Sequence, residues 1–137
     1  MQSYFHLAFN VKDLDEARTF YCDMLGCTAG RSTDSWIDIN FFGHQLSLHL
    51  GEPFPTAKTG KVGGHLVPMP HLGAILPLAD WKKLAVRLEE NGLEFVFPPF
   101  ARFVGEPGEQ HTMFFRDPSG NPIEIKGFAD MSGIFAS

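Results

Sequence analysis

Three side chains that could share a divalent metal ion stand far apart along the chain: His6, His71 and Glu124. Each histidine opens a strand-like apolar segment, and Glu124 stands between Ile123 and Ile125 in a third such segment. A carboxylate in an apolar strand is costly to bury unless something pairs with it. Two imidazoles and one carboxylate around a metal ion would meet that need and would leave coordination positions open for catalysis.

The two histidines hold equivalent places in an internal repeat. His6 precedes Gly26 by 20 residues, and His71 precedes Gly92 by 21 residues. Each interval contains a strand-like segment and then an apolar stripe at helical spacing that ends at the glycine. The ends of the two repeats also align, at residues 43–48 and 120–125. If a pseudo-twofold axis relates the repeats, the two histidines face one another across a cavity.

Each repeat predicts a strand, a helix and three further strands, which together form a βαβββ module. Asp13 is expected to cap the first helix, with Glu16 completing a capping box, and Asp80 is expected to cap the second helix. The predicted strands cover residues 4–11, 27–31, 36–42, 45–50, 71–78, 94–97, 111–116 and 122–128. The fold class is therefore α+β, with the two modules forming a cupped mixed sheet around the metal site.

The repeat also predicts how the chain is organised. Residues 1–137 form a single domain, with module one at about 1–52 and module two at about 70–130. Between them, residues at about 53–69 are rich in glycine and proline and are expected to be a flexible linker. A loop near a pocket is expected between the strands at 94–97 and 111–116, where Pro98 and Pro99 stand.

Each candidate ligand also has an ordinary structural explanation. A single histidine is commonly a hydrogen-bonded residue of the core or its rim, and Glu124 alone could be a solvated strand residue. The repeat-equivalent places of the three side chains favour the metal site over these explanations. His44 and His65 fall in a turn and in the linker, where an exposed histidine without a special role is expected.

Composition narrows the class of protein. The net charge is −5 and no cluster of Lys and Arg occurs, so we expect no nucleic acid and no membrane as partner. Cys22 and Cys27 are too few for a disulfide framework, and no signal-peptide pattern is seen. We therefore expect a cytoplasmic protein with a small-molecule substrate. Exposed strand edges in such modules also favour a homodimer.

The chain resembles the vicinal oxygen chelate superfamily, which includes glyoxalases, bleomycin- and fosfomycin-resistance proteins and extradiol dioxygenases. The resemblance covers nearly the whole chain. The matching segments are Phe5-His6-Leu7, Ala17 to Tyr21, Leu25-Gly26, Pro70 to Gly73 and Asp117 to Glu124. The resemblance implies a glyoxalase-like fold in which His6, His71 and Glu124 bind a divalent metal ion. That metal would bind two adjacent oxygens of a substrate.

The resemblance also narrows the chemistry. Glyoxalase-type isomerases of the superfamily use a fourth protein ligand, and the repeat alignment places Ser47 there. Serine is a poor ligand, which favours Fe(II) in a site of two histidines and one carboxylate, although Mn, Ni, Zn or Mg could also serve. His49 lies on the same strand face as Ser47 and is the expected catalytic residue, as an acid or base or as a polar lining residue.

An extradiol-type dioxygenase is the leading expectation for the function. The ring-cleaving signature is matched from Asp117 to Glu124, but Phe114 stands where that signature has Tyr, and His111 is closer to it than the usual upstream histidine. Two alternatives stay open. One is a resistance protein that binds a drug without turnover, and the other is an isomerase, lyase or thiol transferase that uses the same three ligands.

Overall fold

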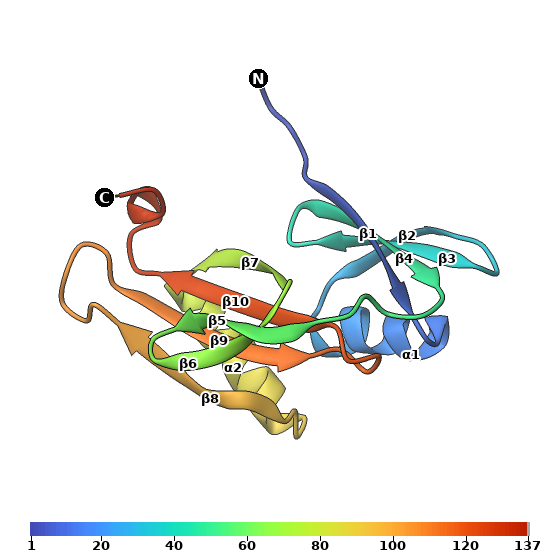
Figure 1. The fold of residues 1–137 in the computed structure, drawn as a ribbon. Helices are drawn as coiled ribbons and strands as arrows, with labels where there is room; N and C mark the ends of the chain where they lie inside the picture. The colour runs from blue at the N-terminus through green and yellow to red at the C-terminus, as the bar shows by residue number, and fades with distance from the viewer. Residues whose placement is uncertain (137) are drawn as a thin grey trace. The chain divides into compact units, whose positions relative to one another are not determined.

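The computed structural model describes residues 1–136, and this part of the chain divides into two compact units. Unit 1 contains residues 1–55 together with residues 117–121, which are the turn between the last two strands of the chain. Unit 2 contains residues 56–116 and the described residues from 122 onward. Each unit has one four-stranded sheet, and Figure 1 shows the elements of each.

Unit 1 is the first βαβββ module. Its elements are β1 (His6–Val11), α1 (Leu14–Arg18), the π-helical turn η1 (Thr19–Met24), β2 (Thr28–Ser32), β3 (Trp36–Phe41) and β4 (His44–Leu50). The strand order in its sheet is β1-β4-β3-β2. Strands β1 and β4 are parallel, and the other neighbours are antiparallel. The first and last strands of the module therefore lie side by side.

The helix of unit 1 begins where the sequence predicts. Asp13 has an extended backbone, and its Oδ1 accepts a hydrogen bond of 2.9 Å from the N–H of Glu16. After one regular turn the helix continues as η1, and Gly26 ends it with a φ of 79°. Side chains of β3 alternate, so that Ile37 and Ile39 are buried while Asp38 lies on the more open face.

A hydrogen-bond cluster ties residues 117–121 into unit 1. The buried Tyr21 hydroxyl donates to Asp117 Oδ2 at 2.8 Å, and Asp117 also accepts from the backbone N–H groups of Ser119 and Asn121. Asn121 Nδ2 donates to the carbonyl oxygen of Asn10 at 3.0 Å. The Asp-Pro-Ser-Gly-Asn segment is thus a turn held by its own carboxylate, directly before the strand that carries Glu124.

Unit 2 is the second βαβββ module, preceded by a hairpin. Its elements are β5 (Ala57–Val62), β6 (His65–Met69), β7 (Leu72–Pro77), α2 (Leu78–Glu90), β8 (Phe95–Arg102), β9 (Gln110–Arg116), β10 (Pro122–Phe128) and the 3-10 turn η2 (Met131–Gly133). The strand order β7-β10-β9-β8 repeats the order of unit 1, with β7 and β10 parallel. The predicted α+β fold of two βαβββ modules is confirmed.

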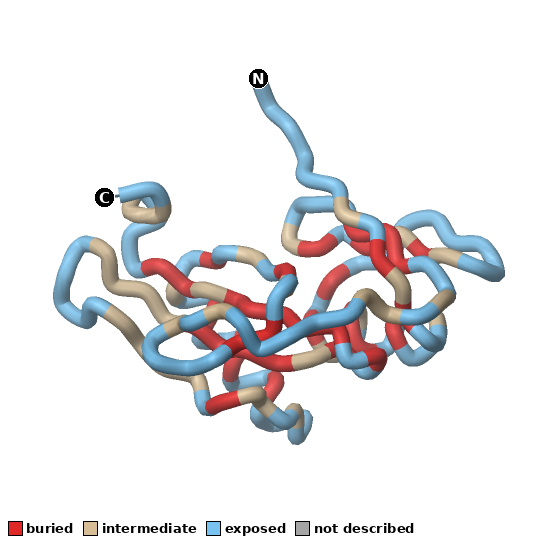
Figure 2. The backbone as a smooth tube through the Cα atoms, in the orientation of Figure 1, coloured by how far each residue is buried: buried red, intermediate tan, exposed pale blue. Residues whose placement is uncertain are grey.

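The sheet of unit 2 is covered on both faces, which buries its central strands β9 and β10 (Figure 2). On one face, Trp81 of α2 donates a hydrogen bond of 2.8 Å to the carbonyl oxygen of Ile125. On the other face, Val67 of the β5–β6 hairpin packs with Phe97 and Phe114. Glu124 pairs directly with Phe114, so Glu124 belongs to the face that the hairpin partly covers.

Three sequence predictions about unit 2 need correction. Residues 53–69 are not a plain linker, because residues 57–69 form the β5–β6 hairpin, which gains stability by burying Val67 on the sheet. Strand β8 continues through Pro98 and Pro99 to Arg102, with register shifts that accommodate the prolines. Asp80 lies in the first turn of α2, whose N-cap is Pro77. No helix in residues 1–136 is long and apolar enough to cross a bilayer.

Candidate metal centre

Glu124 lies in the middle of β10, and its side chain is only 6% exposed. Ile123 and Ile125 point to the α2 face because side chains alternate along a strand. This leaves Glu124 on the hairpin face, beside Phe114 and Gly73 on the neighbouring strands. Gly73 allows the close approach of β7, since a Cβ atom there would overlap the carbonyl oxygen of Glu124.

His71 stands next to this carboxylate. It lies immediately before β7, and its Nε2 is 3.3 Å from Glu124 Oε1. The imidazole is 19% exposed and meets the ring of Phe114 edge-on, with the ring centroids 4.9 Å apart. Unit 2 therefore brings together two of the three predicted metal ligands, and their facing atoms are the ones that would donate to a metal ion.

Two further contacts orient these donor atoms. The carbonyl oxygen of Pro68 can only accept a hydrogen bond, so the 2.9 Å contact requires His71 Nδ1 to carry a proton. Nε2 then donates to Glu124 when the imidazole is protonated, and in the neutral imidazole its lone pair is available to a metal ion. On the other side, the Thr112 hydroxyl donates to Glu124 Oε2 at 2.6 Å and leaves Oε1 toward the histidine. Such outer contacts are typical of metal sites, so the residues present fit a divalent cation.

The electrostatics of the pair agree with this geometry. The hydrogen bond with Glu124 raises the pKa of His71 above its usual value, although burial opposes the shift. Burial alone would raise the pKa of Glu124, but the hydrogen bonds from His71 and Thr112 outweigh burial and hold that pKa below the usual value. Glu124 is thus held as a carboxylate, the form that a metal ion binds.

The third predicted ligand, His6, belongs to unit 1. It is the first residue of β1, is exposed, and pairs with Gln45 of β4. Among the described residues, no group of three or more His, Cys, Asp or Glu side chains is gathered closely enough to hold a metal ion. The structure thus brings His71 and Glu124 together, and the part of His6 in the site stays a prediction.

Ser47, the residue at the possible fourth-ligand position, is already engaged in unit 1. It is buried on β4, and its hydroxyl donates a hydrogen bond of 2.7 Å to Asp38 Oδ1 on β3. In the parallel pairing Ser47 stands opposite Ala8, whereas Glu124 stands opposite Gly73, so the two residues hold equivalent positions. A neutral serine hydroxyl is a poor metal ligand by type, and here it is directed to Asp38.

The remaining histidines have identifiable surroundings. His49 is exposed on β4 near Trp36, with the ring centroids 6.5 Å apart. His44 Nδ1 accepts a hydrogen bond of 3.1 Å from the N–H of Phe5. His65 stacks on Phe97 in the hairpin cluster. His111 contacts Trp81 of α2 and bonds to Glu109, so it lies on the face of the sheet opposite Glu124.

Sequence reasoning missed the residues that orient the ligands. Thr112 could have been found, because it lies two residues before Phe114 on the neighbouring strand and so shares a face with Glu124. The role of Pro68 could not be predicted from side-chain patterns, because its contact with His71 uses a backbone carbonyl group. Lys126 shares the face of Glu124 by the same alternation and was also overlooked.

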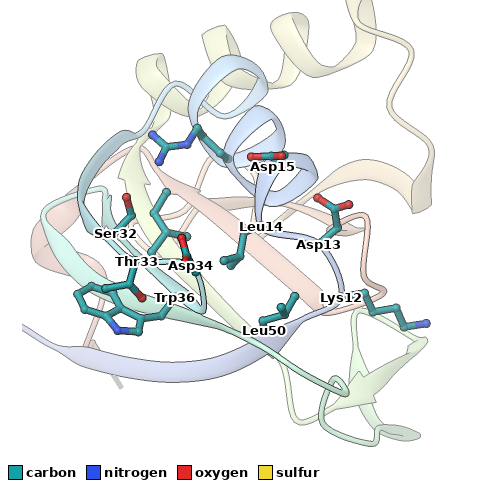
Figure 3. A pocket seen from close by; sticks show the side chains of 11 residues that line it. Lys12, Asp13, Leu14, Asp15, Ser32, Thr33, Asp34, Trp36 and Leu50 are labelled. Carbon is teal, nitrogen blue, oxygen red and sulfur yellow. The ribbon is translucent and has the colours of Figure 1, made fainter.

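Unit 1 has a pocket of about 520 Å³ between α1 and the β2–β3 end of its sheet (Figure 3). Leu14, Thr33, Asp34 and Trp36 are among the residues that line it. The described lining residues include no histidine and no glutamate, and none of the candidate ligands. The pocket is therefore not assigned to the metal centre.

Comparisons with known proteins identify the family. A profile of the glyoxalase/bleomycin resistance protein/dioxygenase superfamily matches residues 3–125, so the chain belongs to that superfamily. A glyoxalase/bleomycin resistance protein/dioxygenase from Alicyclobacillus acidocaldarius is 31% identical, with a TM-score of 0.76 over 98% of this chain and 97% of that chain.

Two other solved structures share the fold at lower identity. A virulence protein from Salmonella typhimurium is 23% identical, with a TM-score of 0.65 over 94% of this chain and 98% of that chain. The fosfomycin resistance protein FosX from Listeria monocytogenes is 15% identical, with a TM-score of 0.69 over 97% of this chain and 98% of that chain. At these identities the similarity shows the fold alone.

Proposed function

We propose that the chain is a divalent-metal-dependent enzyme that acts on a small substrate with two adjacent oxygens. Its metal ligands would be His71 and Glu124 of unit 2 with His6 of unit 1. The observation that carries the proposal is the 3.3 Å distance between His71 Nε2 and Glu124 Oε1. Hydrogen bonds orient both side chains, from His71 to the Pro68 carbonyl and from Thr112 to Glu124. A divalent metal bound there would supply Lewis-acid chemistry at the two substrate oxygens.

The protein groups around the site have separable roles. The Thr112 hydroxyl holds one oxygen of Glu124, and the Pro68 carbonyl fixes the tautomer of His71. The β5–β6 hairpin covers part of the same sheet face, because its Val67 packs on Phe114 of β9, and this cover limits the access of water to Glu124. His49 is the proposed acid or base, because it shares the strand face of Ser47 and is exposed to solvent.

Within this class we favour the extradiol-type dioxygenase with Fe(II). The engagement of Ser47 with Asp38 supports a site of three protein ligands, and an octahedral Fe(II) would then keep three positions open. A four-ligand isomerase is less well supported, because the equivalent position holds a neutral serine hydroxyl, which is a poor metal ligand. Mn, Ni, Zn or Mg in the same three-ligand site would support a lyase or a thiol transferase instead.

Oxygen uptake tests the dioxygenase proposal. Protein reconstituted anaerobically with Fe(II) would be mixed with catechol in an oxygen electrode, beside Glu124→Ala and His49→Ala variants. We expect catechol-dependent uptake in the native protein, loss in Glu124→Ala, and slower uptake with full iron content in His49→Ala. Bound iron without any uptake would exclude catechol as the substrate and would favour the isomerase, lyase or thiol transferase chemistry. Binding of an aromatic drug by metal-free protein would instead support the sequestering alternative.

A further inference from the structure

A cationic side chain shares the sheet face of the proposed metal centre. Lys126 lies two residues after Glu124 on β10, so both side chains project to the same face. Lys126 pairs with Thr112 on β9 and with Ile75 on β7, which places it directly beside the residue that holds Glu124. Its neighbours on β10, Ile125 and Gly127, are buried toward α2.

The ammonium group of Lys126 has no fixed partner in the described part of the chain. Neither a hydrogen bond nor an ion pair to this side chain is formed in residues 1–136, although the residue is half-buried. Its charge nevertheless lies close to the centre, because Thr112, its partner on β9, donates a hydrogen bond to Glu124 Oε2. A lysine of this kind covers its aliphatic stem and keeps its ammonium group accessible, so the charge is available to an anionic ligand on the same face.

The charges on this sheet face also favour an anionic ligand once a metal ion is bound. Without metal, the carboxylate of Glu124 is an opposite charge on the same sheet face as Lys126, two residues away on β10. A divalent cation on His71 and Glu124 would engage that carboxylate and bring two more positive charges to the face. The site would then be strongly positive and would favour an anionic molecule.

We propose that Lys126 is a specificity-determining residue that selects an anionic substrate for the metal centre. The inference rests on the proposed function, and it narrows the substrate class to carboxylates or other anions that present two adjacent oxygens. Lys126 would bind the negative group through a charge-assisted hydrogen bond while the metal ion binds the oxygen pair. Lys126 would also weaken metal binding in the absence of substrate, since like charges repel.

The test uses Mn²⁺ and three probes that differ in charge but share two adjacent oxygens: oxalate, oxamate and oxamide. The dissociation constant of Mn²⁺ is measured first, from the electron paramagnetic resonance signal of the free ion. Binding of each probe to the Mn²⁺-loaded protein is then measured by calorimetry. The variants are Lys126→Met, the charge-conserving Lys126→Arg, and Lys83→Met on the exposed face of α2 as a matched control.

We expect opposite changes in Lys126→Met: Mn²⁺ binds as tightly as before or more tightly, whereas oxalate and oxamate bind on the order of tenfold more weakly. Oxamide, which is neutral, should keep its affinity, and Lys126→Arg should retain oxalate binding. Lys83→Met should change nothing. A damaged fold would weaken Mn²⁺ and all three probes together, so it cannot imitate this pattern.

Two results would overturn the inference, and they differ from one another. In the first, native protein binds Mn²⁺ and oxalate, but Lys126→Met binds oxalate as tightly as before or binds all three probes more weakly by the same factor. This result would remove Lys126 from the site and leave the metal centre intact. Native protein that binds no Mn²⁺ would overturn the proposed metal centre and the role of Lys126 with it.

Discussion

Ser47 holds in the sheet of unit 1 the position that Glu124 holds in the sheet of unit 2. Ser47 stands opposite Ala8 and Glu124 opposite Gly73, in both cases two residues beyond a candidate histidine. The two modules thus share a register but differ in chemistry at one position. Unit 2 has a carboxylate there, whereas unit 1 has a hydroxyl bonded to Asp38.

This equivalence predicts that a fourth ligand can be added. Ser47→Glu alone would set a carboxylate against Asp38, so the substitution is combined with Asp38→Asn. We expect the double variant to bind Mn²⁺ on the order of tenfold more tightly than Asp38→Asn alone, in calorimetric titrations. Equal affinities would argue that Ser47 does not share the surroundings of the metal ion.

Thr112→Val should weaken metal binding without removing it. The substitution deletes the hydroxyl that donates to Glu124 Oε2 but keeps the size of the side chain. Loss of such an outer contact costs roughly tenfold or more in metal affinity, measurable by competition with a chelator. Thr59→Val, on the exposed strand β5, is the control and should have no effect. A full-affinity Thr112→Val protein would show that this hydrogen bond does not orient a ligand.

Gly73→Ala should destabilise unit 2. A Cβ atom at this position would overlap the carbonyl oxygen of Glu124, so β7 and β10 must separate locally. We expect a loss on the order of 3 kcal/mol in the free energy of unfolding, measured with urea. Gly108→Ala is the matched control, because no atom lies within 4 Å of its added Cβ. Equal stabilities of the two variants would contradict the close pairing at Gly73.

Cys27 makes the stability of the protein fall in alkaline solution. Burial raises the pKa of its thiol from 9.0 to about 11. The native state therefore keeps the proton that the unfolded chain loses, so this contribution is complete below pH 9 and is lost as the pH rises through about 11. A shift of about two pKa units corresponds to roughly 3 kcal/mol.

The comparison with Cys27→Ala isolates this effect. Tyr21 also has a raised pKa, mainly because it is buried and next because of Asp117, and it contributes in the same direction. Cys27 is the smallest cause of that shift, so the contribution of Tyr21 is nearly the same in both proteins. Urea unfolding at pH 8, 9.5 and 10.5 should therefore show a smaller decline for Cys27→Ala than for the native protein. Parallel declines would mean that the thiol titrates alike in the folded and unfolded states.

The regular parts of the fold could be predicted from local patterns. The strand from Pro122 to Phe128 has the predicted bounds, and Asp13 and Gly26 mark the ends of the first helix region as expected. These features depend on alternation, capping and left-handed glycine, which are local. The β5–β6 hairpin was not predicted, because its stability comes from Val67 meeting aromatic residues that are distant in the sequence.

Part of the candidate site could also be predicted from local patterns and from the repeat. Glu124 was indicated by its position between two isoleucines, and the repeat indicated His71, and the structure brings the two together. The extension of β8 past Pro98 was not predicted, because proline lacks the N–H group that hydrogen-bonds to a neighbouring strand. The structure shows that register shifts between β8 and β9 accommodate the prolines. Whether His6 completes the ligand set depends on contacts that no local pattern encodes.

Metal content tests the central claim most directly. Protein purified anaerobically, in native form and as Glu124→Ala, would be analysed by inductively coupled plasma mass spectrometry, with His6→Ala and His71→Ala in parallel. We predict about one divalent metal ion per chain in the native protein and loss of that metal in each variant. Native protein that stays free of metal after reconstitution with Fe(II), Mn(II) and Zn(II) would contradict the claim, and full occupancy in any one variant would remove that residue from the ligand set.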